Sequence, residues 1–217
     1  MYAIKGFGRL LSCLAALLSL VVLAGCLQSK TLLLGEADFV QPLPDEFTVF
    51  GYTQKDGVYA LNVEENGAPK KTQFARSGAG YQPVGETGML YFARKGEGNS
   101  YLVAISDTVG VFYGFVEIRD HVMLSRFMST DPGKDLETIR SLAGEASEAV
   151  EGLQVENGAL LIPGTDALYL ISDLVQKGEL ALQGGPFYWL PGHVDGTDPA
   201  AAPPAKLDAQ GKVIGNG

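Results

Sequence analysis

Residues that could do chemistry are few in this chain, and the cysteines are the most informative of them. Of its two cysteines, Cys13 lies inside an apolar run at residues 10–24 and Cys26 follows the end of that run. Lys5 and Arg9 precede the run, which is shorter than the roughly 20 apolar residues that a membrane-spanning helix needs. This layout is typical of a secretory signal peptide. We therefore predict a signal that is removed, with Cys13, rather than a retained membrane anchor.

The residues that close the run resemble the lipobox of bacterial lipoproteins. Residues Leu23 to Cys26 read Leu-Ala-Gly-Cys and match the pattern of Leu, a small or apolar residue, Gly or Ala, and Cys at all four positions. The resemblance implies cleavage before Cys26, a thioether-linked diacylglycerol on its sulfur, and an acyl chain such as palmitate on the new amino terminus. Several acyl chains give stable anchoring where one chain would be marginal. The alternative is an ordinary signal peptide with a chance cysteine.

The same resemblance suggests a location in the cell. In the lipoprotein sorting pattern of Gram-negative bacteria, Asp after the cysteine favours retention in the inner membrane. The residue after Cys26 is Leu27. The resemblance therefore implies a lipid-anchored protein of the bacterial cell envelope, on the periplasmic face of the outer membrane if the source has one.

The net charge argues against two classes of main partner. The chain has 16 basic and 25 acidic residues. Because Lys5 and Arg9 are the only charged residues before Cys26, their removal leaves 14 bases against 25 acids, a formal charge of −11. Nucleic acid or anionic lipid as a main partner would be repelled by this charge. We expect the membrane as one partner, through lipid on Cys26, with an envelope protein or glycan as a possible second, and the sequence leaves the oligomeric state open.

No catalytic constellation is evident. His121 follows Asp120 in an expected turn, His193 lies in a glycine-containing loop, and neither has the spacing of a metal-binding pair. Nucleophile motifs of the Gly-x-Ser-x-Gly and Ser-x-x-Lys types are absent from the sequence. Gly133-Lys134 is followed by Asp135 rather than by the Ser or Thr of a phosphate-binding loop. We assign no catalytic or metal-ligating residue and expect no cofactor.

Three consecutive aromatic residues, Phe187, Tyr188 and Trp189, are the best candidates for a recognition surface. Trp189 is the only tryptophan. Strand alternation would send Phe187 and Trp189 to one side and Tyr188 to the other. Such a group can close a core, or it can be exposed and bind a glycan or a protein. The sequence leaves both interpretations open.

The elements that must position these residues are mostly strands. Apolar alternation and Gly-containing turns predict hairpins, and the stretch 111–118 is apolar on both faces, which requires cover on both sides. Residues 77–88, with four glycines and Pro83, are expected to be a loop. The expected hairpins are 47–53 with 58–64, 89–94 with 100–106, and 111–118 with 122–128.

Two helices are expected in the second half. Leu136, Ile139, Ala143, Ala146 and Val150 form one apolar stripe, which predicts a helix over 135–150. A second helix is predicted over 167–177, capped by Thr165 or Asp166 and closed by Gly178.

The predicted fold class is α+β: a mostly antiparallel meander with two helices packed on it in the second half, or a mainly β fold as the fallback. The expected organisation is a lipoprotein signal peptide at 1–25, an acylated N-terminus and short tether at 26–30, one domain at 31–190, and a disordered Pro/Ala/Gly-rich tail at 191–217. Residues 31–34 could already be the first strand.

Three functions remain open. The first is a lipid-anchored envelope protein with a non-enzymatic binding or structural role. The second is an envelope hydrolase acting on glycan or peptide, which would need a concave cluster containing His121 or paired acids. The third is a carrier of an apolar ligand in a cavity between sheet and helices.

Overall fold

The computed structural model describes residues 26–94, 98–144, 147–196, 198 and 201–215. The expected signal peptide, with the lipobox residues Leu23 to Gly25, lies outside this part of the chain. The fold is α+β, mostly antiparallel β with two α-helices in the second half, as the sequence predicts. None of the helices within these ranges is long and apolar enough to cross a membrane.

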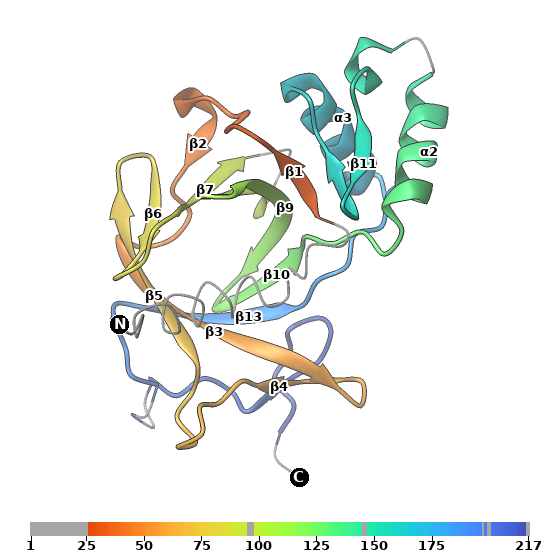
Figure 1. Ribbon diagram of the computed structural model, residues 1–217. Coiled ribbons are helices and arrows are strands. Elements are labelled where there is room, and N and C mark those ends of the chain that lie inside the picture. Colours follow the sequence, from red (N-terminus) through yellow and green to blue (C-terminus); the bar gives the residue numbers. More distant parts are fainter. Residues whose placement is uncertain (1–25, 95–97, 145–146, 197, 199–200, 216–217) are drawn as a thin grey trace, which may run out of the picture.

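Eight strands close into an antiparallel β-barrel (Figure 1). Closure comes from β10, which pairs with β9 on one edge and with β13 on the other. Because the wall is closed, its strands have few free edges at which another chain could add. In order around the wall the strands are β10 (Val122–Arg126), β13 (Pro186–Pro191), β3 (Glu46–Lys55), β5 (Lys71–Ser77), β6 (Gly80–Pro83), β7 (Met89–Arg94), β8 (Ser100–Asp107) and β9 (Gly110–Arg119).

The three predicted hairpins are confirmed. They are β3 with β4 (Val58–Leu61), β7 with β8, and β9 with β10. In the first turn Asp56 and Gly57 both have positive φ, at 52° and 81°, the backbone that a two-residue hairpin turn requires. The stretch expected to be a loop contains a strand that was not predicted, β6, because its pairing with β5 depends on the neighbouring strand and not on its own pattern.

Aromatic side chains fill the barrel interior. Phe47 stacks on Phe74 with ring centroids 5.0 Å apart, and Tyr81 meets Phe47 edge to face. Tyr81 in turn contacts Phe92. The apolar cavity that remains here has a volume of about 30 Å³, room for on the order of one water molecule.

A second core lies between the barrel wall and the helices. It joins the outer face of β8 and β9 to α2 (Pro132–Ala143) and α3 (Thr165–Gln176). Tyr113 of β9 faces the helices and Val116 faces the barrel interior, so this strand is covered on both sides, as its sequence requires. Ile139 and Ile171, from the two predicted stripes, are fully buried here.

The helices differ from their predicted bounds at the ends. The first begins at Pro132, after the N-cap Asp131, and ends at Ala143, where Gly144 takes φ 82°. A short 3-10 turn, η2 (Glu148–Val150), follows the interruption, and Ala146 lies outside the described residues. The second helix has Gly164, not Thr165 or Asp166, at its N-cap.

The N-terminal segment is part of the sheet from its first described residues. Leu27–Ser29 forms β1, antiparallel to β9 and parallel to β12 (Ala159–Leu161), and Leu27 is fully buried. The expected tether at 26–30 is therefore structured, and residues 31–34 do not form the first strand. β12 is also one strand of a hairpin with β11 (Gln154–Glu156).

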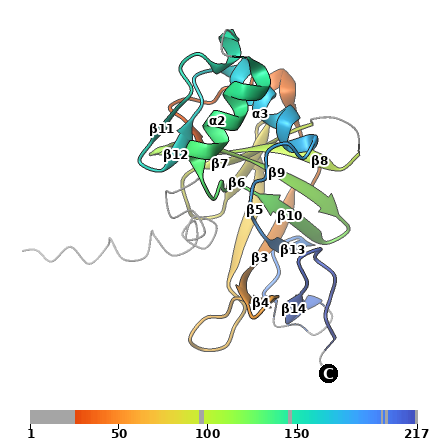
Figure 2. The same cartoon turned by 90° about the vertical axis from the view of Figure 1, so that its right-hand side faces the viewer.

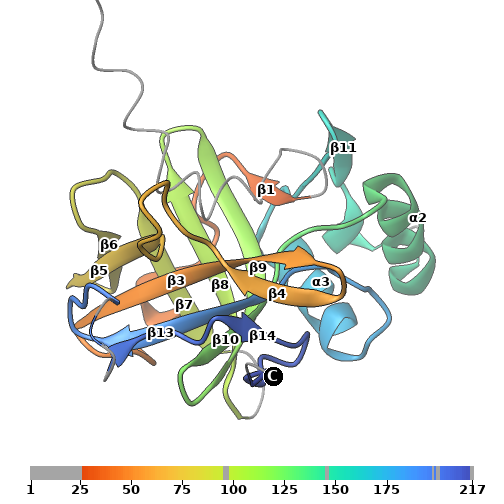
Figure 3. The same cartoon turned by 90° about the horizontal axis from the view of Figure 1, so that it is seen from below.

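The C-terminal segment also differs from expectation. It was expected to be disordered, but β14 (Lys206–Leu207) pairs with β4, and Leu207 is fully buried. The Tyr52 hydroxyl donates a hydrogen bond of 2.7 Å to the Pro204 carbonyl. Figure 2 shows β4 and β14 on the side of the barrel opposite the helices, and Figure 3 shows them lying over β3 and β13. The remaining short elements are η1 (Glu36–Asp38) and β2 (Phe39–Val40), which pairs with β7.

Candidate functional site

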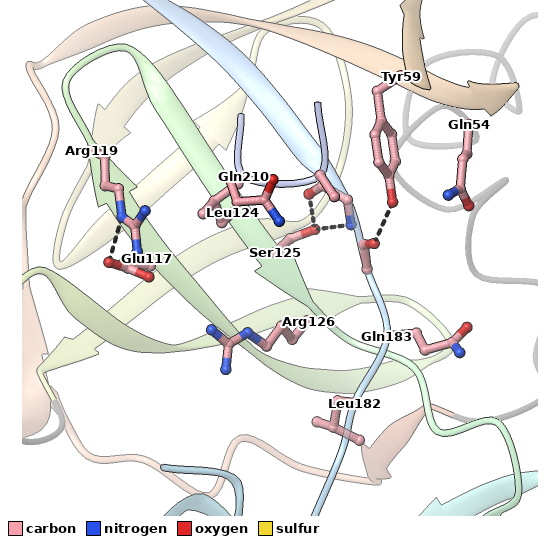
Figure 4. A pocket seen from close by; sticks show the side chains of 13 residues that line it. Gln54, Tyr59, Glu117, Arg119, Leu124, Ser125, Arg126, Leu182, Gln183 and Gln210 are labelled. Carbon is pink, nitrogen blue, oxygen red and sulfur yellow. Dashed lines mark hydrogen bonds and ion pairs between the residues drawn. The ribbon is translucent and has the colours of Figure 1, made fainter. Parts of the chain in front are cut away.

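A cleft of about 510 Å³ opens on the outer face of the β9–β10 hairpin (Figure 4). The hairpin forms its floor. Three other segments form its walls: residues 182–185 before β13, the β3–β4 hairpin, and residues 209–210 of the C-terminal segment. Segments that are far apart in the sequence therefore build one recess.

Strand alternation turns polar side chains of the floor away from the barrel. Ile118 belongs to the barrel core, so its neighbours Glu117 and Arg119 point outward. Leu124 is opposite Glu117 in the register of β9 and β10, and Arg126 follows two residues later on the same face. The floor thus carries three charged side chains around one leucine.

The wall at residues 184–185 lies directly on β10. The Ser125 hydroxyl donates to the Gly185 carbonyl at 2.8 Å, and the Ser125 amide donates to the same oxygen at 3.0 Å. A Cβ atom on Gly184 would lie 2.0 Å from the Ser125 carbonyl oxygen, so only glycine permits this approach. Tyr59 closes the wall on the other side, since its hydroxyl donates to the Gly184 carbonyl at 3.2 Å.

The C-terminal wall is held by a compact turn. The Asp208 carboxylate accepts hydrogen bonds from the amides of Gln210 and Lys212 at 2.9 Å and 2.8 Å. Buried Leu207 anchors the turn through β14. Gln210 is thereby placed at the edge of the cleft.

The charge of the cleft is opposite in sign to that of the chain. Glu117 accepts a 2.6 Å hydrogen bond from Arg119, and this bond raises the pKa of the Arg119 guanidinium. The Arg126 side chain is exposed and makes no hydrogen bond or ion pair with the described residues. The lining therefore holds two arginines and one glutamate, a net charge of +1, in a chain of formal charge −9.

Amide side chains complete the polar lining. Figure 4 shows Gln54 and Gln183 on the side of the cleft away from Glu117 and Arg119, with Gln210 between. Each amide offers both a donor and an acceptor. The cleft can therefore bind a polar, hydrogen-bonding ligand, and its unpaired arginine can bind an anionic group.

Cys26 lies near this cleft but does not line it. Its side chain is buried at 1% exposure, and its carbonyl accepts a 2.9 Å hydrogen bond from the Leu160 amide. Burial raises the pKa of the Cys26 thiol, so an unmodified thiol would stay protonated and be a poor nucleophile. Cys26 forms a β-bridge with Met128, and Met128 forms another with Gln183 of the cleft wall.

The structure brings His121 to the predicted aromatic group. The His121 ring centroid lies 5.3 Å from that of Trp189 and 5.8 Å from that of Tyr188, and its Nδ1 is 3.1 Å from the Trp189 carbonyl oxygen. Phe187 is buried in the barrel core, Trp189 packs against that core, and Tyr188 faces the opposite side, the alternation that the sequence predicts. Trp189 Nε1 is buried and has no hydrogen-bond partner among the described residues.

The other candidate residues stay apart from the cleft. His193 Nε2 is 3.2 Å from the Phe74 carbonyl oxygen. No group of three His, Cys, Asp or Glu side chains in the described ranges could hold a metal ion. Among the described residues Glu117 is the only carboxylate that lines the cleft, whereas sugar hydrolysis commonly uses two. The residues that build the cleft carry no spacing signal in the sequence; outward alternation on the predicted strand 122–128 was the one clue to Arg126.

Comparison of the chain with models of protein families, with curated proteins and with solved structures finds no match in any of the three.

Proposed function

We propose that this protein is a lipid-anchored protein of the bacterial cell envelope that binds a polar ligand in the cleft on β9 and β10. The observation that carries the binding role is the cleft itself, a recess of about 510 Å³ lined by amide, hydroxyl and guanidinium groups. The match of residues 23–26 to the lipobox supports the anchor.

The cleft is a better candidate for ligand binding than the aromatic residues 187–189 or the barrel interior. Phe187 lies in the barrel core and Trp189 packs against that core. Neither ring is therefore fully available to bind a partner. The barrel interior offers about 30 Å³, whereas small-molecule sites are commonly about 300–1,000 Å³. The volume of the cleft falls within that range.

Site-specific cross-linking in intact cells tests the binding role. A photoreactive amino acid in place of Gln183, in the cleft wall, should give a discrete adduct. The matched control carries the same amino acid in place of Val84, which is 52% exposed and outside the cleft. Equal labelling at both positions, or none from position 183, would contradict binding in the cleft.

A further inference from the structure

Cys26 and Arg126 lie near each other in the sheet. One edge of β9 pairs with β10 as far as Arg126, which is opposite Phe115, and then with β1, in which Leu27 is opposite Tyr113. Cys26 therefore occupies the place where β9 changes partner. Neighbouring strands are about 4.8 Å apart and successive residues about 3.3 Å, so the backbones of Cys26 and Arg126 are separated by on the order of 10 Å or less.

We propose that Arg126 binds the phosphodiester of a phospholipid headgroup, in the same bilayer that holds the acyl chains of Cys26. This inference rests on the proposed lipid anchor and names the ligand class of the proposed cleft. An anchor at Cys26 brings Arg126 to the membrane surface, and acyl chains inserted there bring headgroups within reach of the cleft.

The charges of the cleft suit a single negative charge. Arg119 is already paired with Glu117, which leaves the guanidinium of Arg126 as the cation available to a ligand. A guanidinium can donate two parallel hydrogen bonds to phosphate oxygens. The net charge of +1 on the lining matches a phosphodiester, which carries one negative charge.

The amide groups around Arg126 suit the rest of a headgroup. Gln183 and Gln210 line the cleft with Arg126, and amides hydrogen-bond to the hydroxyls of a glycerol headgroup as both donor and acceptor. Leu124 and Leu182 add apolar surface beside them. The cleft thus offers a guanidinium for the phosphate of a glycerol phosphodiester and amide groups for its hydroxyls.

The position of Arg126 also affects which face of the protein turns toward the membrane. The segment from Cys26 onward has a formal charge of −11, so an anionic bilayer repels the protein as a whole. Charges act mainly within a Debye length, about 8 Å at physiological ionic strength. An unpaired arginine beside the anchor therefore favours contact between the cleft face and the headgroups.

Calorimetric titration of the full lipidated protein, purified in a neutral detergent, tests the proposal. The probes are dihexanoyl-phosphatidylglycerol, which is monoanionic, the zwitterionic dihexanoyl-phosphatidylcholine, and glycerophosphoglycerol, which has the same diester and no acyl chains. The variant is Arg126→Gln. The control is Arg94→Gln, which removes an exposed arginine from β7.

We expect the wild-type protein and Arg94→Gln to bind the phosphatidylglycerol about tenfold or more tightly than Arg126→Gln does, the size of a charge-assisted hydrogen bond. The phosphatidylcholine has the same phosphodiester but no glycerol hydroxyls, so it should bind the wild-type protein more weakly than the phosphatidylglycerol does. Glycerophosphoglycerol should bind more weakly than the lipid; equal binding would assign the site to a free diester and overturn the lipid source. An affinity for the phosphatidylglycerol that is unchanged in Arg126→Gln, or an equal loss in Arg94→Gln, would overturn the proposal. Cross-linking from position 183 and acylation of Cys26 are separate readouts, so the proposed function can stand if this inference fails.

Discussion

Cys26 and Gln183 are separated in the sheet by one residue, Met128, which forms an antiparallel bridge with each. The amide of Gln183 donates to the Met128 carbonyl at 2.6 Å, and the Met128 amide donates back at 3.0 Å. The proposed lipid attachment site and the wall of the cleft therefore belong to the same hydrogen-bonded structure. A lipid on Cys26 would hold the cleft at a nearly constant distance from the bilayer, because no flexible tether lies between them.

Replacing Cys26 with alanine should abolish incorporation of radiolabelled palmitate and release the protein from the membrane fraction, since Cys26 is the only cysteine outside the expected signal peptide. The matched control is Cys13→Ala, which should keep both label and membrane association. Label that persists in Cys26→Ala would overturn the anchor assignment.

Replacing Gly184 with alanine should distort the wall of the cleft. The new methyl group would lie 2.0 Å from the Ser125 carbonyl oxygen, so the segment must move, at a cost of about 1–3 kcal/mol in the free energy of unfolding. Urea denaturation measures this cost. Gly35→Ala is the control, because its Cβ would meet nothing closer than 3.6 Å and the midpoint should barely change. Equal midpoints for the two variants would show that the close contact is not present in solution.

Replacing Tyr52 with phenylalanine should loosen the C-terminal segment. Burial, and secondarily the charge of Tyr188, raise the pKa of the Tyr52 hydroxyl, so it remains a donor to the Pro204 carbonyl. Loss of this hydrogen bond should cost about 0.5–1.5 kcal/mol. Hydrogen exchange should accelerate at residues 205–214 and nowhere else. In the control Tyr91→Phe, exchange in this segment should be unchanged; equal acceleration in both variants would contradict the assigned role of Tyr52.

The pKa of Asp195 should depend on Lys71. Their 2.8 Å ion pair lowers the pKa of the Asp195 carboxyl below its ordinary value of 3.8. A pKa that is lower in the folded state stabilises the fold above the pKa of the unfolded carboxyl, and this stabilisation is lost as the pH falls through the folded value. Lys71→Gln should return the pKa toward 3.8, as followed by carboxyl NMR titration. Lys70→Gln is the control and should leave the pKa of Asp195 lowered; a low pKa in Lys71→Gln would show another cause.

Local features of the fold could be predicted because short-range chemistry determines them. Asp56 and Gly57 can take positive φ and so specify a tight turn. The stripe that contains Ile139, and the cap glycine Gly178, specify helices. The limits of such reasoning appear at Gly144, which ends α2 although the apolar stripe continues to Val150.

The candidate site could not be predicted in the same way, because its residues come together only through long-range pairing. Gln54, Glu117, Gln183 and Gln210 have no fixed spacing, and each is unremarkable in its own segment. Cys26 was the one candidate whose role was predicted from the sequence, because the lipobox pattern that residues 23–26 resemble is linear and does not depend on the fold.

By itself, the sequence determined the fold class, the three hairpins, the two helices, the net acidic charge and the motif at Cys26, all of which depend on residue type and near neighbours. Only the tertiary structure decided that β10 pairs with β13 and closes a barrel, that Leu27 begins a buried strand, and that the C-terminal segment packs against β4. The physical reason is that a strand pattern specifies which face is buried but not which strand will be its partner. Partner choice depends on the free energy of the whole barrel.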